Sequence, residues 1–299
     1  MRRVLGSLVV LACLFGAGAP ARALVPRQVF GIGNTMEFTA PRLQALKPEA
    51  SRINAPWDVA LRRGPDRARI DDWYRLSLAA GLDPLLSFQG RDATVPTVSR
   101  YRRAFLAAVR RWPRVGEWQT WNEGNHPSQP VTWRHPRRAA RFAKMMERAC
   151  PRCTILPITT ILSDQRPTAR WLRRWLDEYG KTPAIWAVHD YGDVNRGGTS
   201  RMRHFIALHP RGRIWVTETG AFAKFDEEWP YSLARQKRYT PLVFRSALRH
   251  KDRVDRIYWW EWRGRSKPAE AEWDTGLVDA FGRPRPAYFA ALKARFRRH

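Results

Sequence analysis

Eight short apolar runs alternate with longer amphipathic runs along this chain of 299 residues. The short runs have the length and composition of buried β-strands, and the longer runs place apolar residues at the spacing of helices. Strands that alternate with helices in this way are typical of parallel β-α units, so the pattern predicts the α/β class. The expected strands are residues 29–33, 50–54, 84–88, 117–123, 154–159, 185–189, 213–218 and 256–260.

Eight such units predict a single (β/α)8 (TIM) barrel over residues 24–299, a length near the roughly 250 residues typical of that fold. The expected helices are residues 41–46, 70–80, 99–112, 136–149, 168–179, 200–208, 232–250 and 286–297. Pro241 falls inside the seventh of these, where we expect a kink or break. An open doubly wound sheet is the alternative, but Gly31-Ile32-Gly33 is only a fragment of the glycine-rich loop that usually follows its first strand.

Residues 1–23 have the features of a Sec-type signal peptide. Arg2 and Arg3 form a basic start, residues 4–19 are mostly apolar, and Ala21-Arg22-Ala23 is a small-residue cleavage site. The apolar run is shorter than the ~20 residues that a transmembrane helix needs, and a lipoprotein signal at Cys13 is an open alternative. We expect a secreted protein, cleaved after Ala23, that is not an integral membrane protein.

The formal net charge is +27 and comes mainly from arginine. The basic residues are spread along nearly every expected helix, which is typical of a solvated outer ring of helices. No nucleic-acid-binding motif accompanies them, so nucleic acid is not an expected partner. A surface of this charge could hold the protein near an anionic cell envelope by long-range attraction.

Two cysteines, Cys150 and Cys153, follow the signal peptide, and in an exported chain they predict a short-loop disulfide. A redox-active pair would need a thioredoxin-like pattern around it, and a zinc site would need two more ligands; neither pattern is visible. The histidines are scattered, so we expect no metal site and no cofactor.

Polar side chains concentrate at the C-terminal ends of the expected strands, where a (β/α)8 barrel carries its active site. The fourth strand ends in Trp121-Asn122-Glu123, and the seventh ends in Glu218. Two carboxyl groups at one rim are what glycosidic bond cleavage requires, one as acid and the other as nucleophile or base. The sequence therefore indicates Glu123 and Glu218 as catalytic residues.

This arrangement resembles the clan A glycoside hydrolases, which are (β/α)8 barrels that retain the anomeric configuration. The resemblance implies that Glu123, preceded by Asn122, is the acid/base and that Glu218 is the nucleophile. It implies that Asn122 binds the sugar 2-hydroxyl and that Arg52 supports the nucleophile. His189 and Tyr191 resemble the clan's His-x-Tyr on the sixth strand, whose tyrosine hydrogen-bonds the nucleophile.

Clan members have a tryptophan on the eighth strand that lies under the sugar. Trp262 is the best match to it, and Trp260, which would point to the same side of the strand, is the alternative. Position near a strand end or loop adds Asn54, Trp57 and His126 as substrate-binding candidates. Gly124 and Gln89 depart from the residues usual in the clan, proline and histidine, which leaves the particular family open.

The sequence thus predicts an exported retaining glycoside hydrolase that cleaves β-linked poly- or oligosaccharides without a cofactor. Two alternatives stay open. One is a catalytically inactive barrel that binds carbohydrate at the cell envelope, because a fold alone does not confer activity. The other is a basic protein that binds an anionic polymer.

Overall fold

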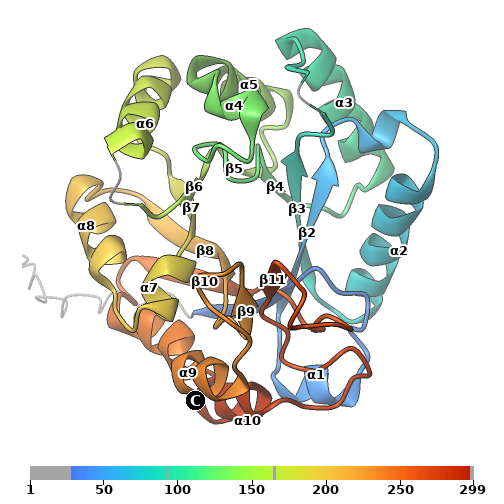
Figure 1. Ribbon diagram of the computed structural model, residues 1–299. Coiled ribbons are helices and arrows are strands. Elements are labelled where there is room, and N and C mark those ends of the chain that lie inside the picture. The colour runs from blue at the N-terminus through green and yellow to red at the C-terminus, as the bar shows by residue number, and fades with distance from the viewer. Residues whose placement is uncertain (1–27, 93, 164–165, 297–299) are drawn as a thin grey trace, which may run out of the picture.

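The computed structural model describes residues 28–92, 94–163 and 166–296, so the expected signal peptide lies outside the described residues. Within them, nine parallel strands curve into a nearly closed barrel that helices surround (Figure 1). The prediction of an α/β fold of the (β/α)8 type is therefore confirmed. No helix among these residues is both long and apolar enough to cross a membrane.

The barrel strands follow the order β5-β4-β3-β2-β1-β10-β8-β7-β6, and every neighbouring pair is parallel. Their bounds are β1 (Val29–Gly33), β2 (Ala50–Pro56), β3 (Asp83–Gln89), β4 (Glu117–Gln119), β5 (Thr154–Leu156), β6 (Thr159–Ile161), β7 (Ile185–His189), β8 (Arg213–Thr219) and β10 (Val254–Trp259).

The fifth expected strand, residues 154–159, is two short strands, β5 and β6, at the two ends of the sheet order. Pro157 separates them, and its missing N–H interrupts the ladder of hydrogen bonds. The backbone N–H of Thr120 still donates to Leu156 O at 3.1 Å, and that of Ala187 donates to Ile158 O at 3.3 Å. Together β5 and β6 take the place of one strand, so the barrel keeps the eightfold arrangement.

The fourth expected strand is also shorter than predicted, because β4 ends at Gln119 rather than at Glu123. Glu123 has a φ of 45°, in the left-handed region that no strand residue adopts. The segment nevertheless stays at the rim: Asn122 N donates to Phe88 O at 2.6 Å, and Gly124 N donates to Thr159 O at 3.1 Å.

The helices begin where the sequence supplies a start signal. Proline stands in the first turn of α1, α2, α4, α5 and α10, and the hydroxyls of Thr97 and Ser232 cap α3 and α9. Pro241 does not break α9, whose buried face continues beyond it through Phe244. The bounds are α1 (Pro41–Ala45), α2 (Pro65–Ala79), α3 (Val98–Arg111), α4 (Pro130–Trp133), α5 (Pro136–Ala149), α6 (Arg166–Tyr179), α7 (Tyr191–Asn195), α8 (Ser200–Leu208), α9 (Leu233–Arg249) and α10 (Pro286–Ala294), with a 3-10 helix at Val59–Leu61.

Two glycines of β1 make room for aromatic rings, one from β10 and one from the residue that follows it. A Cβ on Gly31 would lie 2.4 Å from the ring of Tyr258, and a Cβ on Gly33 would lie 2.1 Å from the ring of Trp260. Tyr258 belongs to a small buried cluster, separate from the main core, with Trp215 of β8. The glycines of residues 31–33 therefore serve aromatic packing rather than a phosphate loop.

The strand β8 contains one extra residue relative to both of its neighbours. Val216 and Glu218 pair with Val188 and His189, which are consecutive residues of β7, and the register against β10 shifts over the same stretch. Such a β-bulge changes the direction in which the following side chains point. Glu218 lies directly after this irregularity.

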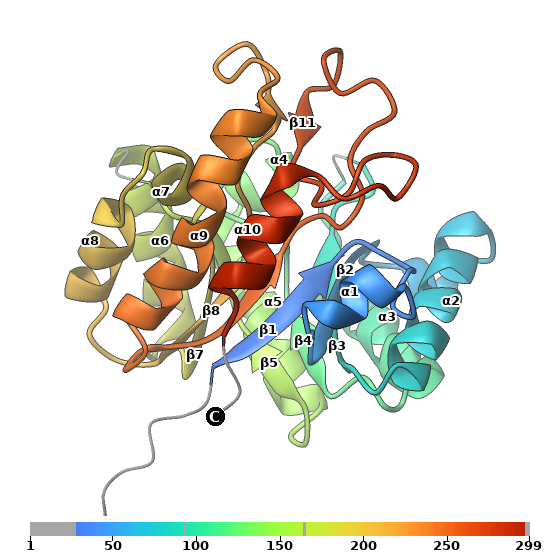
Figure 2. The ribbon, with the colours of Figure 1, turned by 90° about the horizontal axis from the view of Figure 1, so that it is seen from below.

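Two further strands, β9 (Lys224–Phe225) and β11 (Trp273–Asp274), pair antiparallel outside the barrel. Figure 2 shows β11 on the side toward which the arrow of β2 points, which is the C-terminal end of the barrel. These segments therefore belong to the end of the barrel that carries the polar strand termini.

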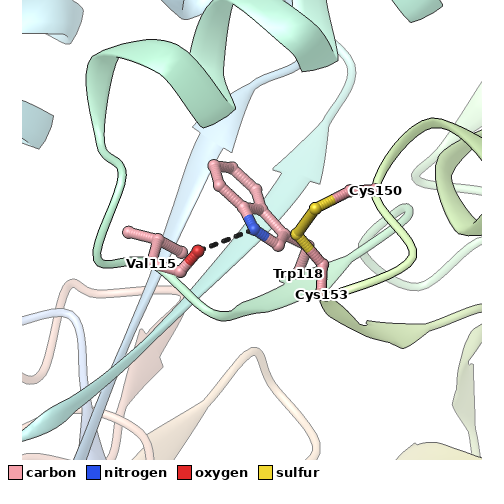
Figure 3. Close-up of a disulfide and its surroundings, with 4 residues drawn as sticks. All are labelled: Val115, Trp118, Cys150 and Cys153. Carbon is pink, nitrogen blue, oxygen red and sulfur yellow. Dashed lines mark hydrogen bonds between the residues drawn. A yellow bond between two sulfur atoms is a disulfide. The ribbon is translucent and has the colours of Figure 1, made fainter.

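The predicted disulfide between Cys150 and Cys153 is present, with 5.4 Å between the Cα atoms (Figure 3). It joins the end of α5 to the start of β5, at the N-terminal end of the strands. Trp118 of β4 lies beside it and donates its indole N–H to Val115 O at 2.9 Å.

Candidate active site

Glu218 is a buried carboxylate at the C-terminal end of the barrel, with 5% of its surface exposed. Its Oε1 accepts hydrogen bonds from Arg52 Nη1 at 2.6 Å and from Asn54 Nδ2 at 3.3 Å. Its Oε2 accepts from the hydroxyl of Tyr191 at 3.1 Å. Two donors on β2 and one on α7 thus fix both oxygens.

The guanidinium of Arg52 is itself fixed by its surroundings, since the side chain is fully buried. Its Nε donates to Gln119 Oε1 at 3.2 Å and its Nη2 donates to Asn122 Oδ1 at 2.9 Å. Its Cζ lies 4.9 Å from the centre of the Trp260 ring, a favourable cation-π distance. Arg52 therefore presents a positive charge to Glu218 in one orientation.

This environment lowers the pKa of Glu218. Burial alone would raise it, but the charge of His189, the charge and hydrogen bond of Arg52, and the hydrogen bond of Asn54 act in the opposite direction and outweigh burial. The carboxylate form of Glu218 is therefore favoured at neutral pH.

Glu123 lies opposite Glu218, with His189 between them. His189 Nδ1 is 2.8 Å from Glu123 Oε1 and 3.6 Å from Glu218 Oε2, and the imidazole is fully buried. One carboxylate oxygen of each glutamate and a ring nitrogen of His189 lie within 4.8 Å of one another. We call these three residues the carboxylate cluster. The side chain of Glu123 is 18% exposed against 6% for Glu218, so Glu123 is the carboxyl that solvent reaches more easily.

An aromatic wall stands beside the cluster. Tyr191, Phe222 and Trp260 form a buried group of their own, and Phe225, Trp229 and Trp273 pack against it half-buried. Phe225 and Trp273 lie on the paired strands β9 and β11. Flat apolar rings next to paired carboxyl groups suit the C–H faces of a sugar.

The structure brings together most of the residues that the sequence singled out: Arg52, Asn54, Asn122, Glu123, His189, Tyr191, Glu218 and Trp260. The preference for Trp262 over Trp260 is corrected. Trp262 is 1% exposed, donates to Glu37 Oε2 at 3.3 Å and packs near Tyr288 in the main core, so it has no face to offer a substrate.

The side chains of two other candidates make their contacts elsewhere, although the backbone N–H of His126 donates to Glu123 O at 2.9 Å. Trp57 is 8% exposed and packs near Tyr101 in the main core, with 6.0 Å between ring centres. The imidazole of His126 bonds within its own loop, with Nδ1 2.7 Å from the hydroxyl of Ser128. Neither contact connects these side chains to the carboxylate cluster, although both residues follow barrel strands as expected.

Sequence reasoning assigned no role to three polar residues at this end of the barrel. Gln119 holds Arg52 and lies in β4, two residues before the Trp-Asn-Glu run that drew attention. Asn34 and Glu261 follow β1 and β10, and Asn34 Nδ2 donates to Glu261 Oε1 at 2.8 Å. The position of Asn34 and Glu261 just after a strand could have indicated a role at this end, but neither residue belongs to a motif that the sequence shares with the clan.

The carboxylate cluster also offers three ligand atoms at a spacing that a divalent cation could use. The sequence placed all three residues at one rim but predicted no metal site, because the histidines are scattered along the chain. The guanidinium of Arg52 already occupies Glu218 Oε1 at 2.6 Å, and its charge would repel a cation there. Arg52 therefore disfavours a cation at the carboxylate cluster.

No protein-family model and no curated protein matches the chain. Solved structures do share its fold. A family 39 glycoside hydrolase from the gut symbiont Bacteroides cellulosilyticus WH2 aligns with a TM-score of 0.61 and 15% identity, over 91% of this chain and 64% of that one. Xylanase B from Clostridium stercorarium F9 aligns with a TM-score of 0.66 and 14% identity, over 89% and 96%.

A structure described as apo β-glucosidase 1317 aligns with a TM-score of 0.58 and 15% identity, over 86% of this chain and 87% of that one. This chain spans less than two thirds of the family 39 protein and nearly the whole of the xylanase. The structural neighbours are thus glycoside hydrolases of the kind that the sequence resembles, and they share its barrel.

Proposed function

We propose that this protein is a retaining glycoside hydrolase with Glu218 as nucleophile and Glu123 as acid/base. One observation carries the proposal: oxygens of the two carboxyl groups lie within 4.8 Å of each other. Retaining enzymes hold their carboxyl groups about 5–5.5 Å apart, whereas inverting enzymes leave roughly 6.5–9.5 Å for a water molecule. The unequal surroundings of the two glutamates support their different roles.

In the first step, ionised Glu218 attacks the anomeric carbon and forms a glycosyl ester. Glu123 gives its proton to the departing glycosidic oxygen, so the leaving group departs as an alcohol. The Tyr191 hydroxyl and Arg52 hold the attacking carboxylate in place. Fixed donors of this kind cost no reorganisation when the reaction occurs.

In the second step, Glu123, now ionised, accepts a proton from water. The water oxygen bonds to the anomeric carbon, and the bond to Glu218 breaks, which restores both carboxyl groups to their starting states. His189, with its Nδ1 2.8 Å from Glu123, holds the acid/base and lies close to both carboxyl groups throughout.

The substrate class we propose is a β-linked poly- or oligosaccharide. The aromatic wall around Trp260 and Tyr191 supports a sugar ligand. The structural neighbours include xylanases, among them an endo-β-1,4-xylanase, and a β-glucosidase, which are enzymes of β-linked substrates.

Screening β-linked glycans, with product configuration followed by proton NMR, tests this proposal. We expect the β-anomer to form first and to mutarotate later. Azide should rescue Glu218→Gly with an α-glycosyl azide as product and Glu123→Ala with a β-glycosyl azide. First appearance of the α-anomer would overturn the retaining mechanism. Unchanged hydrolysis by both Glu123→Gln and Glu218→Gln would overturn the site, and an inactive wild type that still binds glycans would indicate a carbohydrate-binding barrel.

We also propose that the protein is exported and held at an anionic cell envelope. The signal-peptide pattern of residues 1–23 and the net charge of +27 support this. A mature protein that begins at Leu24 and leaves cell walls in moderate salt is the expected result. An unprocessed N-terminus, or retention that salt does not change, would contradict it.

A further inference from the structure

Glu261 is a third carboxylate at the C-terminal end of the barrel, and the mechanism above does not use it. Its side chain is 6% exposed. Asn34 Nδ2 donates to its Oε1 at 2.8 Å, and Arg265 Nη2 donates to the same oxygen at 2.9 Å. Among the described residues, no hydrogen bond reaches Oε2. A buried carboxylate with one satisfied oxygen is prepared to accept one more donor.

The backbone of Glu261 is held as firmly as its side chain. Its N–H donates to Thr275 Oγ1 at 2.7 Å, and the same threonine hydroxyl donates to Trp260 O. Asn34, which holds Oε1, also donates its backbone N–H to Arg52 O at 3.0 Å. Glu261 is thus tied through Asn34 to the residue that supports Glu218, so its position is fixed relative to the carboxylate cluster.

The order of the strands in the barrel indicates which part of a substrate would face Glu261. Glu123 follows β4 and Glu261 follows β10. Around the barrel, the strands β3, β2 and β1 lie between β4 and β10 in one direction. In the other direction three strands also lie between them, when β5 and β6 are counted as one. The two carboxyl groups therefore come from opposite sides of the barrel. Glu123 protonates the leaving group, so the leaving group lies on the β4 side. The sugar that Glu218 attacks extends toward β10.

We propose that Glu261 determines specificity by accepting, at Oε2, a hydrogen bond from a hydroxyl of the sugar that becomes attached to Glu218. Trp260, the residue before Glu261, supplies the adjacent apolar ring. The substrate class is then a β-glycoside whose non-reducing-side sugar carries a free hydroxyl at this position. The inference rests on the proposed function and adds a residue to the same site.

Kinetics with aryl β-glycosides of xylose, glucose and their β-1,4-linked disaccharides test this role. For Glu261→Gln and Glu261→Ala, we expect kcat/KM to fall roughly 10- to 100-fold, the range of a lost charge-assisted hydrogen bond. The fold-loss should be equal for 4-nitrophenyl and 2,4-dinitrophenyl leaving groups, because Glu261 contacts only the sugar. For Glu123→Ala the two fold-losses should differ, since 2,4-dinitrophenol, the better leaving group, needs no acid.

Glu270→Gln is the matched control. This carboxylate is 70% exposed, lies in the same loop and pairs with Lys267 at 3.1 Å.

A series of singly deoxygenated aryl glycosides separates recognition from a structural role. The wild type should lose roughly 10- to 100-fold at one ring position, and Glu261→Ala should show no further loss there. Equal penalties in the wild type and Glu261→Ala at every position would overturn the inference while leaving the proposed function intact. A wild type that hydrolyses none of these glycosides or β-linked glycans would overturn the proposed function and this inference with it.

Discussion

The two ends of the barrel each hold an arginine–glutamate pair next to a tryptophan, partly buried at the N-terminal end and buried at the C-terminal end, and the two pairs behave differently. At the N-terminal end, Arg256 contacts both oxygens of Glu117 at 2.9 Å and lies 4.0 Å from the centre of the Trp215 ring. At the C-terminal end, Arg52 contacts Glu218 at 2.6 Å and lies 4.9 Å from the Trp260 ring.

Burial raises the pKa of Glu117 to about 7, with Asp83 adding to the effect and Arg256 opposing it. The pKa of Glu218 is lowered instead, although burial acts on it in the same direction as on Glu117. The difference comes from the extra partners of Glu218, namely His189 and Asn54. An arginine alone does not keep a buried carboxylate ionised; the additional donors and charge make one of two similar pairs suitable for nucleophilic attack.

Removing each carboxylate in turn is the most severe test of this comparison. Glu218→Gln should lower kcat by at least ~10⁴-fold, because the nucleophile is lost. Glu117→Gln should keep activity within about threefold, since it lies at the other end of the barrel and far from the reaction. Hydrolysis rates of purified, folded variants decide this. Comparable losses in both would remove the distinction between the two ends.

Removing each arginine tests the electrostatic part of the comparison. Arg52→Met should raise the pKa of Glu218 and move the acidic limb of the kcat/KM profile upward by roughly 1 unit or more. The sign follows because Glu218 must be ionised, and without Arg52 ionisation needs a higher pH. Arg256→Met is the control and should leave that limb in place. Arg52→Met should also lose stability, by about 3–5 kcal/mol, because it leaves the buried carboxylate of Glu218 without its positively charged partner.

The stability of the protein should depend on Glu117 in a defined pH window. Its pKa is about 7 in the folded chain against 4.5 ordinarily, so the folded state binds more protons between these values. The contribution to the free energy of unfolding is therefore complete below pH 4.5 and falls by about 3 kcal/mol as pH rises past 7. Urea unfolding of wild type and Glu117→Gln between pH 4 and 8 measures the difference; equal slopes would contradict it.

The disulfide should give the smallest effect, and again on stability alone. Replacing Cys150 and Cys153 by serine opens a loop with a sequence separation of 3, which should cost about 2 kcal/mol. Because the bridge lies at the N-terminal end of the strands, kcat/KM should not change. Thermal unfolding and kinetics of the double variant check this. A loss of activity in a folded variant would mean that the two ends are coupled.

Sequence analysis reached the fold and both glutamates of the carboxylate cluster because these depend on local signals. The alternation of strands and helices has a short period, and Asn122-Glu123 is a contiguous motif at a strand end. The division of the fifth strand was also accessible, since Pro157 cannot complete a ladder of hydrogen bonds. The apolar residues on both sides of Pro157 instead favoured one continuous strand.

The remaining features depend on contacts between strands. Trp260 and Trp262 are two residues apart, so a strand pattern would point them to the same side. The space that Gly33 leaves on the neighbouring strand decides that Trp260 is the one beside Arg52. The extra residue in β8 is visible only in its register against β7 and β10. The link between Asn34 and Glu261 joins residues separated by 227 positions. Such pairings cannot be found from one sequence without its partner strands.

The absence of a side chain at Gly33 sets a condition for anyone who would redesign this barrel. The ring of Trp260 fills the space that a side chain at residue 33 would occupy. Even a methyl group there would therefore push the tryptophan toward the place we assign to the sugar. A transplant of the carboxylates, the arginine and the tryptophan into another scaffold would therefore be incomplete. The recipient must also supply a glycine on the adjoining strand.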